Sequence, residues 1–339
     1  MIILHDFFTQ KGGGENLIIS IAQKYNSKIY TLLNKSYPNL DNIHVFRLTK
    51  FFQIFSKSLF FLISCFFIKI KTKETLVFSG NYLIFSIWRC VSPKIIIYHH
   101  SLPKSVFSEK YIGFNRNLIN FLIKKPILAL LKFNLSKVDI IYFNSEKSKV
   151  KFTDLIELDP KKTKLKILYP FSNLELNNSY RKPKDYIVIN SRHSEEKNIL
   201  SVLDLIKDRP EIKCYVTNYG ILTKSLQFKF QNYNNIFLCG YLTEEKYSDM
   251  LSGAIAIVFP SFDEDFGIAT LDAYNSNIPL IIYKNAGFSE ILGPKYELYL
   301  DNVDLFNSIK LVVGNGSRNY YSSRINFKLE FFKEFDKYN

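Results

Sequence analysis

One stretch of the chain, from Pro260 to Asp272, combines residue types that could bind an anion together with hydroxyl groups. An apolar run predicts a buried strand that ends at Pro260, and a helix is expected to begin at about Ile268. Ligands of open α/β sheets bind beyond the carboxyl ends of strands, where a helix N-terminus offers N–H groups to a phosphate. Gly267 would let the backbone approach closely, and the carboxylates of Glu264 and Asp272 would accept hydrogen bonds from sugar hydroxyls.

A second loop supplies the positive charge that this acidic segment lacks. It runs from Asn190 to Asn198 after another predicted strand and contains Arg192 and Lys197. A guanidinium can bind a diphosphate through two parallel hydrogen bonds, and an ammonium acts as a point charge. Either loop alone would be interpreted as solvated surface. Because two strand-end loops of opposite charge occur in one α/β domain, we expect them to form a single site.

The first half of the chain contains two further candidates. The glycine-rich turn Lys11–Glu15 precedes a predicted helix, and such turns can bring backbone N–H groups close to a phosphate. Taken alone, this turn is better explained as a simple connection; its candidate ligand-facing residues are Gly13 and Gly14. His99 and His100 end a predicted strand, where a packed histidine is the alternative to a functional one.

The second half, from about residue 185 to residue 292, resembles the donor domain of the retaining glycosyltransferases of the two-domain GT-B fold, in particular family 4. The family motif has Pro-Ser, a variable pair, then Glu, Gly, Phe, Gly and a second Glu further on. In this chain Asp265 replaces the first Gly, and Asp272 replaces the second Glu. The positions that match in the two loops are Arg192, Glu196, Lys197, Pro260, Ser261, Glu264, Phe266, Gly267 and Ala273.

The resemblance implies transfer of a sugar from a nucleotide-diphosphate sugar to an acceptor, with retention at the anomeric carbon. Arg192 and Lys197 would hold the diphosphate, Glu264 would bind the transferred sugar, and Asp272 would bind the ribose. Phe266, Gly267 and Ile268 complete the expected donor site. The family uses neither a metal nor another cofactor, so none is expected here.

In the same family, a glycine loop of the first domain faces the donor phosphate and the acceptor, as Gly13 and Gly14 would here. A strand-end histidine lies near the transferred sugar. His100 fits that position slightly better than His99, and we expect one of the two, together with Glu264, to take part in catalysis.

Short apolar runs alternate with amphipathic segments along the chain, a pattern typical of βαβ units in a parallel sheet. We therefore expect an α/β fold with two Rossmann-like domains, and the resemblance implies that they face each other across a cleft. Residues 1–172 would bind the acceptor, residues 173–320 the nucleotide sugar, and residues 321–339 would form a helix that crosses back to the first domain. The expected strands cover residues 1–5, 28–32, 75–79, 94–99, 139–144, 185–191, 212–217, 235–240, 254–260 and 279–283.

The net charge of +14 is concentrated in the first half, where residues 1–172 hold 26 Lys and Arg against 10 Asp and Glu. The excess predicts an anionic partner, with solvated surface as the alternative. Phe51–Ile70 reads as a buried or interfacial helix that is too short to span a bilayer, and Pro103–Lys137 is a second basic stretch. We expect a cytoplasmic protein, peripheral on the inner face of the membrane, whose acceptor is a lipid-linked saccharide or a polysaccharide precursor.

Three alternatives stay open at this point. A nucleotide-sugar epimerase of the same fold would need no acceptor, and a degenerate transferase would bind sugar nucleotide without catalysis. Nucleic-acid binding is disfavoured because no recognised motif accompanies the basic charge.

The four cysteines lie far apart in sequence, which disfavours a zinc site or a disulfide framework.

Overall fold

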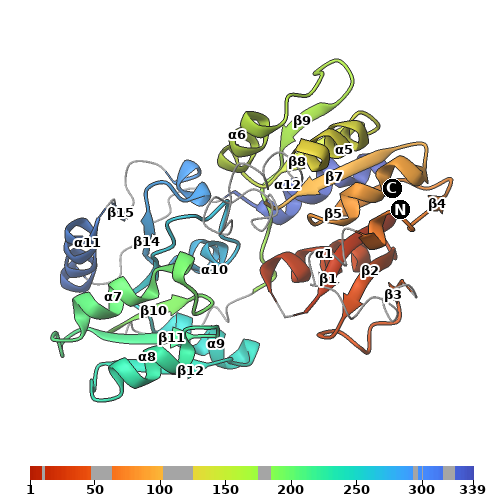
Figure 1. Cartoon of the computed structure of the whole chain (residues 1–339). Coiled ribbons are helices and arrows are strands. Elements are labelled where there is room, and N and C mark those ends of the chain that lie inside the picture. The colour runs from red at the N-terminus through yellow and green to blue at the C-terminus, as the bar shows by residue number, and fades with distance from the viewer. Residues whose placement is uncertain are drawn as a thin grey trace. The chain divides into compact units, whose positions relative to one another are not determined.

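The computed structural model describes residues 1–9, 12–46, 63–101, 125–174, 185–292, 297–299, 301–315 and 325–339. The chain forms two compact units (Figure 1). Unit 1 comprises Met1–Pro170 and Phe327–Asn339, and unit 2 comprises Phe171–Asn326. The boundary expected after residue 172 thus falls after Pro170. Most of the expected helix at residues 51–70, and residues 103–124 of the second basic stretch, lie outside the described residues.

Unit 1 contains a seven-stranded parallel sheet with the strand order β3-β2-β1-β5-β7-β8-β9. All five residues of β7 are buried, which explains why the central strands read as continuous apolar runs without alternation. A separate short pair is formed by β4 and β6. The strands are β1 (Ile2–Phe8), β2 (Lys28–Asn34), β3 (Ile43–Val45), β4 (Ile70–Lys71), β5 (Leu76–Ser79), β6 (Cys90–Val91), β7 (Ile95–His99), β8 (Ile140–Phe143) and β9 (Lys164–Ile167).

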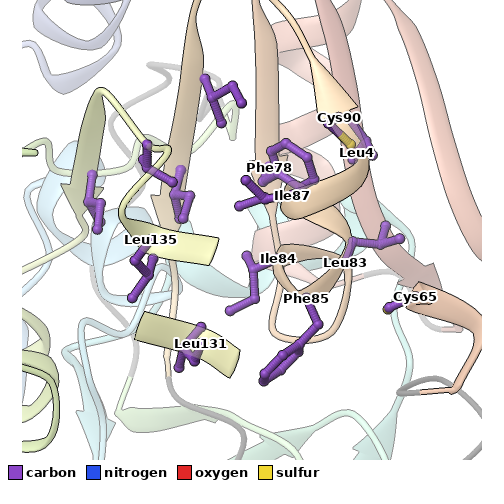
Figure 2. Packing of buried hydrophobic residues seen from close by; sticks show 14 of the residues in the cluster. Leu4, Cys65, Phe78, Leu83, Ile84, Phe85, Ile87, Cys90, Leu131 and Leu135 are labelled. Atoms are coloured by element: carbon purple, nitrogen blue, oxygen red, sulfur yellow. The ribbon is translucent and has the colours of Figure 1, made fainter. Parts of the chain in front are cut away.

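The helices that follow these strands are α1 (Gly13–Lys24), η2 (Leu83–Arg89), α5 (Lys125–Leu135) and α6 (Glu146–Leu155). Figure 2 shows side chains of η2 and α5 gathered with those of the sheet in one apolar cluster. Phe78, Leu83 and Leu131 are almost fully buried there. This apolar burial is the main stabilising contribution to unit 1.

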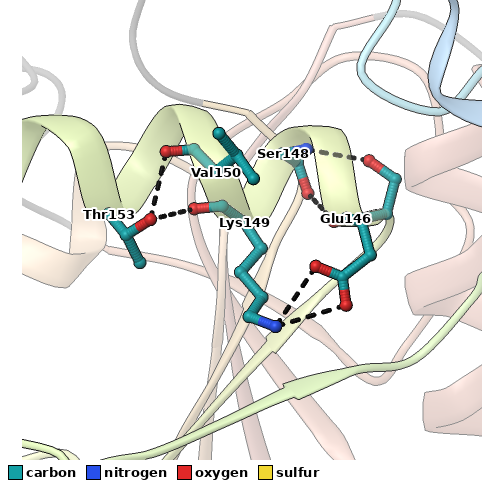
Figure 3. A network of polar contacts seen from close by, with 6 residues as sticks. Glu146, Ser148, Lys149, Val150 and Thr153 are labelled. Atoms are coloured by element: carbon teal, nitrogen blue, oxygen red, sulfur yellow. Dashed lines mark hydrogen bonds and ion pairs between the residues drawn. The ribbon is translucent and has the colours of Figure 1, made fainter.

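Helix α6 begins where a side chain replaces the missing backbone partners of its first turn. The hydroxyl oxygen of Ser145 accepts the N–H of Ser148 at 2.9 Å. On the exposed face, Lys149 Nζ lies 3.2 Å from a carboxylate oxygen of Glu146 (Figure 3). The Ser145 cap places the start of α6 shortly after the end of β8.

Unit 2 contains a six-stranded parallel sheet with the order β12-β11-β10-β13-β14-β15. Its strands are β10 (Tyr186–Asn190), β11 (Lys213–Thr217), β12 (Ile236–Gly240), β13 (Ala256–Phe259), β14 (Leu280–Tyr283) and β15 (Glu297–Tyr299). Its helices are η5 (Glu195–Lys197), α7 (Ile199–Ile206), α8 (Thr223–Phe230), α9 (Glu244–Ser252), α10 (Thr270–Ser276), η6 (Gly287–Glu290) and α11 (Asn302–Asn315). The expected α/β class with parallel sheets is confirmed in both units.

Each sheet has one place where the strand order reverses. In unit 1, β1 lies between β2 and β5; in unit 2, β10 lies between β11 and β13. Ligands of doubly wound sheets bind outside the carboxyl ends of the strands at such a point. The candidate residues that follow β1, β7, β10 and β13 are therefore at the functional edge of their own sheet.

The last helix of the chain, α12 (Phe327–Phe335), and η7 (Asp336–Tyr338) belong to unit 1. The ring of Phe331 packs 5.4 Å from that of Tyr98 in β7 and 4.8 Å from that of Phe335. The hydroxyl of Tyr142 in β8 donates to Glu334 at 2.6 Å. The C-terminal segment is therefore part of the core of unit 1. None of the described helices is both long enough and apolar enough to cross a membrane.

Candidate active site

The basic and the acidic loop of unit 2 are neighbours because their strands pair. β10 and β13 are parallel, with Ile187 opposite Ala256. The loop after β10 carries Arg192 and Lys197, and the loop after β13 begins at Pro260. The two loops are also bonded directly, since the hydroxyl of Ser261 donates to the carbonyl oxygen of Glu196 at 3.0 Å. The structure thus joins two segments that lie far apart in sequence.

Lys197 and Glu264 form an ion pair across these loops. Their side chains expose only 17% and 25% of their surface, so the pair is shielded from water on most sides. Arg192 exposes 53% of its side chain, and its Nη2 lies 3.8 Å from Glu196. The two loops therefore present a shielded cation paired with Glu264 and a more accessible cation near Glu196, a set that can bind a diphosphate and a hydroxyl-bearing group.

The acidic loop has a fixed shape that depends on two glycines. Gly267 has a φ of +90°, in the region that side chains rarely adopt. The backbone of Asp265 approaches Gly287 so closely that any Cβ at that position would overlap it. Phe266 is buried, with its ring 5.3 Å from that of Phe288. The ring of Phe266 thus anchors the loop in the core of unit 2.

Ile268 is half-buried and precedes α10, which begins at Thr270, slightly later than expected from the sequence. The hydroxyl of Thr270 bonds back to the carbonyl oxygen of Gly267 at 2.5 Å. This bond closes the turn that follows the acidic loop. The expected approach of backbone to a phosphate at this turn stays a prediction.

Asp272 lies in a polar network of its own. Its two carboxylate oxygens accept the hydroxyl of Ser172 at 2.6 Å and that of Tyr247 at 3.3 Å. Tyr247 in turn accepts the amide of Asn190, at the end of β10, at 2.5 Å. Burial raises the pKa of Asp272 to about 6, although the bonds from Ser172 and Tyr247 act in the opposite direction. The expected ribose ligand is thus held within unit 2 by residues that the sequence patterns did not single out.

His193 is a further residue that the sequence patterns did not single out. It is fully buried, and both ring nitrogens are bonded: Nδ1 to the hydroxyl of Thr223 at 2.9 Å, and Nε2 to the carbonyl oxygen of Thr217 at 3.1 Å. Its carbonyl oxygen accepts the N–H of Leu222 at 2.9 Å. Burial lowers the pKa of His193. The neutral ring therefore fastens the loop that carries Arg192 to the loop that follows β11.

In unit 1 the two adjacent histidines have different surroundings. His99 is buried, with its ring 4.9 Å from that of Phe152 and 5.5 Å from that of Phe143. His100 is half-buried, and its Nε2 lies 2.8 Å from the hydroxyl oxygen of Ser79. Burial lowers the pKa of His99 to about 3 and that of His100 to about 4. Of the two candidates, His99 is a core residue between rings, and His100 is the one with a polar environment.

The glycine turn lies beside His100. α1 begins at Gly13, and a Cβ built on Gly14 would lie 3.8 Å from Nδ1 of His100. Gly12 occupies the N-cap position without a side-chain cap. Gly14, which follows β1, and His100, which follows β7, thus meet at the carboxyl edge of the sheet. Within the described residues, no group of three His, Cys, Asp or Glu side chains could hold a metal ion.

Residues 174–304 match the family model of the glycosyl transferases group 1. This chain is a glycosyltransferase. The matched segment contains every candidate donor-binding residue of unit 2, from Arg192 to Asp272. No curated protein matches the sequence of this glycosyltransferase significantly.

Solved structures resemble the glycosyltransferase over nearly its whole length. Anabaena HepE, in complex with UDP and glucose, is 13% identical, with a TM-score of 0.69 over 99% of this chain and 98% of that one. WaaG, a glycosyltransferase involved in lipopolysaccharide biosynthesis, is 11% identical, with a TM-score of 0.72 over 100% of both chains. Sucrose-phosphate synthase from Thermosynechococcus elongatus is 13% identical, with a TM-score of 0.72 over 99% and 98%. At these identities the likeness establishes the GT-B fold.

Proposed function

We propose that the protein is a retaining glycosyltransferase of family 4 that uses a nucleotide-diphosphate sugar as donor. The observation that carries this proposal is the contact between Lys197 and Glu264 at the carboxyl edge of unit 2. The contact joins a cation of the kind that can bind phosphate to a carboxylate that can accept sugar hydroxyls, inside a segment that matches the glycosyl transferases group 1. The complex of HepE with UDP and glucose makes a UDP-sugar the first donor to test.

In the proposed reaction, the bond between the anomeric carbon and the diphosphate breaks, and the acceptor oxygen forms a bond on the same face. Arg192 and Lys197 stabilise the negative charge that develops on the leaving diphosphate. Glu264 accepts hydroxyls of the transferred sugar, and Asp272 those of the ribose. The leaving phosphate takes the acceptor's proton, so no protein nucleophile is required. Because the two cations supply the charge that a metal would provide, we propose that the reaction proceeds without one.

Unit 1 contributes His100 to this reaction, and His99 stays in the core. At neutral pH the ring of His100 is uncharged, because burial lowers its pKa to about 4. A neutral imidazole can hydrogen-bond to the transferred sugar but is a poor proton donor in a transfer step. We therefore assign His100 to sugar binding in the transition state, with Gly13 and Gly14 lining the turn beside it.

For the acceptor, we propose a lipid-linked saccharide or a polysaccharide precursor at the inner face of the cytoplasmic membrane. The support is the basic excess of residues 1–172, which favours an anionic membrane surface. WaaG, of similar fold, is involved in lipopolysaccharide biosynthesis. Sedimentation with liposomes that contain or lack anionic lipid tests the proposed membrane binding separately. Equal binding to both kinds of liposome would contradict it.

The experiment that tests the proposed activity is product analysis with purified protein and a panel of nucleotide sugars. Transfer to an added saccharide acceptor, with the anomeric configuration retained and with EDTA present, is the expected result. A new sugar nucleotide formed from the donor alone would indicate an epimerase. Binding of the donor, with neither transfer nor hydrolysis, would indicate a non-catalytic sugar-nucleotide-binding protein.

A further inference from the structure

Two further polar residues of unit 1, Ser79 and His5, connect to His100 and have no role in the proposed reaction. Ser79 ends β5 and is almost fully buried, and His5 lies beside it in β1. Nδ1 of His5 lies 3.1 Å from the carbonyl oxygen of Ser79 and 3.3 Å from its hydroxyl oxygen. The hydroxyl oxygen lies 2.8 Å from Nε2 of His100. The three side chains thus form a row from β1 through β5 to the end of β7.

The positions of the protons in this row follow from which atoms can donate a hydrogen bond and which can only accept one. A carbonyl oxygen only accepts, so Nδ1 of His5 carries a proton and donates it to Ser79. Nδ1 of His5 is then unable to accept the hydroxyl proton of Ser79. Among the residues that the structure describes, Nε2 of His100 is the remaining acceptor that this hydroxyl contacts. If Nε2 of His100 carried the proton, the hydroxyl proton of Ser79 would be buried without a partner, which is costly.

We propose that His5 and Ser79 are positioning residues that fix His100 in the tautomer with its proton on Nδ1. That nitrogen is on the side of the ring that faces Gly14, at the N-terminus of α1. His100 is thereby restricted to donating a hydrogen bond there, to an oxygen of the ligand. The assignment of this oxygen to the transferred sugar rests on the proposed function; the tautomer itself does not.

The backbone around His100 supports a fixed ring. The carbonyl oxygen of His100 accepts the side-chain amide of Asn144, which follows β8, at 2.9 Å. The ring packs edge-on against that of Tyr98 at 5.0 Å. Gly14 leaves room on the Nδ1 side, where any side chain would come into contact with the ring. A neutral ring with one nitrogen bonded internally is a common way for proteins to select the tautomer of a functional histidine.

The test is nitrogen-15 NMR of the histidine side chains, which report directly which ring nitrogen is protonated. The chain has 5 histidines, so the spectrum can be assigned from single His→Gln variants. In the unmodified protein at neutral pH we expect His100 to be protonated on Nδ1. In Ser79→Ala, which lacks the hydroxyl, we expect protonation to move largely to Nε2. Ser79→Thr, which keeps a hydroxyl, should restore the original pattern.

A matched control is Ser86→Ala in η2, because Ser86 is also buried and its hydroxyl bonds a backbone carbonyl at 2.7 Å. This variant should leave the His100 signals unchanged. Protonation on Nε2 of His100 in the unmodified protein would overturn the proposal without any variant being needed. A Ser79→Ala spectrum identical to that of the unmodified protein would also overturn it.

Activity provides a separate readout. If the proposed function holds, Ser79→Ala should lower kcat/KM for glycosyl transfer about tenfold, the loss of one hydrogen bond to the transition state. If the protein transfers no sugar, the proposed function fails while the NMR result still decides the tautomer. If transfer occurs and Ser79→Ala changes the tautomer with no change in kcat/KM, His100 does not donate to the reacting sugar.

Discussion

Glu264 and Lys197 are partners in an ion pair, so each also restrains what the other can bind. A phosphate group must compete with Glu264 for the ammonium of Lys197. The carboxylate also keeps the lysine side chain in place beside the acidic loop. If the proposed donor site is correct, binding of the diphosphate and recognition of the sugar are linked at this pair of residues.

Replacing Glu264 with Gln separates these two effects. The affinity for a nucleoside diphosphate should rise up to about fivefold, because a partly exposed ion pair of roughly 1 kcal/mol no longer competes. Turnover of the nucleotide sugar should fall by about a hundredfold, since the carboxylate proposed to accept the sugar hydroxyls is gone. Calorimetric titration and steady-state kinetics measure the two quantities, with Glu245→Gln on the exposed face of α9 as control. A fall in both quantities together would contradict this division of roles.

The raised pKa of Asp272 predicts a pH dependence of stability. Burial raises that pKa from 3.8 to about 6, so between these values native unit 2 retains a proton that the unfolded chain releases. The free energy of unfolding must then fall as the pH rises through this window, by at most about 3 kcal/mol. Asp272→Asn, which cannot ionise, should lack this fall. Calorimetric scans at about pH 4 and about pH 7 measure the unfolding of unit 2 in the unmodified protein and in Asp272→Asn. The same fall of the free energy of unfolding in both proteins would show that Asp272 is ionised in the native state without penalty.

At the scale of elements, the strand-end loops depend on His193. Its ring is fully buried and fastens the loop after β10 to the end of β11, at Thr217, and to the start of α8, at Thr223. Arg192 precedes it directly in sequence. The position of Arg192 in the loop therefore depends on the buried bonds of its neighbour His193.

His193→Phe keeps an aromatic ring at this position and removes both bonds. We expect the affinity for a nucleoside diphosphate to fall about tenfold, because the free energy of ordering the loop is then required on binding. Titration calorimetry measures this, and His44→Gln, at an exposed position of β3, is the control. An unchanged affinity in a folded His193→Phe protein would show that the Arg192 loop is held by other contacts.

Some of the strands could be predicted from the sequence, whereas the contacts between their loops could not. Strands such as β7 and β13 are apolar β-branched runs, and their positions are evident from the pattern. The short edge strand β3, with two exposed residues out of three, has no such pattern and is not predicted. The contact between Lys197 and Glu264 depends on β10 lying next to β13, and strand order is a property of the whole sheet. Likewise, Ser172 and Tyr247 carry no motif that marks them as partners of Asp272.

At the scale of the whole molecule, the chain passes between the two units twice, after Pro170 and again before Phe327. The second passage returns α12 to unit 1, where Phe331 is fully buried against Tyr98 and Phe335. The stability of the first unit thus depends on the last residues of the chain, which the sheet order alone would not suggest.

Phe331→Ala should accordingly destabilise unit 1 by about 3–5 kcal/mol and leave unit 2 unchanged. Calorimetry that resolves the two unfolding transitions tests this, with the unit 2 transition identified by its shift on addition of nucleoside diphosphate. Leu329→Ala, on an exposed position of the same helix, should have little effect. Equal shifts of both transitions in Phe331→Ala would mean that α12 does not stabilise unit 1 selectively.

The assignment of the donor site is tested by sugar transfer by the purified protein with Lys197 replaced by Ala. Lys213→Ala is the matched control. Lys213 also pairs with a carboxylate, that of Asp185 at 2.8 Å, but this pair lies where β10 and β11 begin, away from the carboxyl edge of the sheet. We predict at least about a hundredfold loss of kcat/KM in Lys197→Ala and none in Lys213→Ala, with both proteins folded. Transfer by Lys197→Ala at the rate of the unmodified protein would contradict the assignment of the donor site.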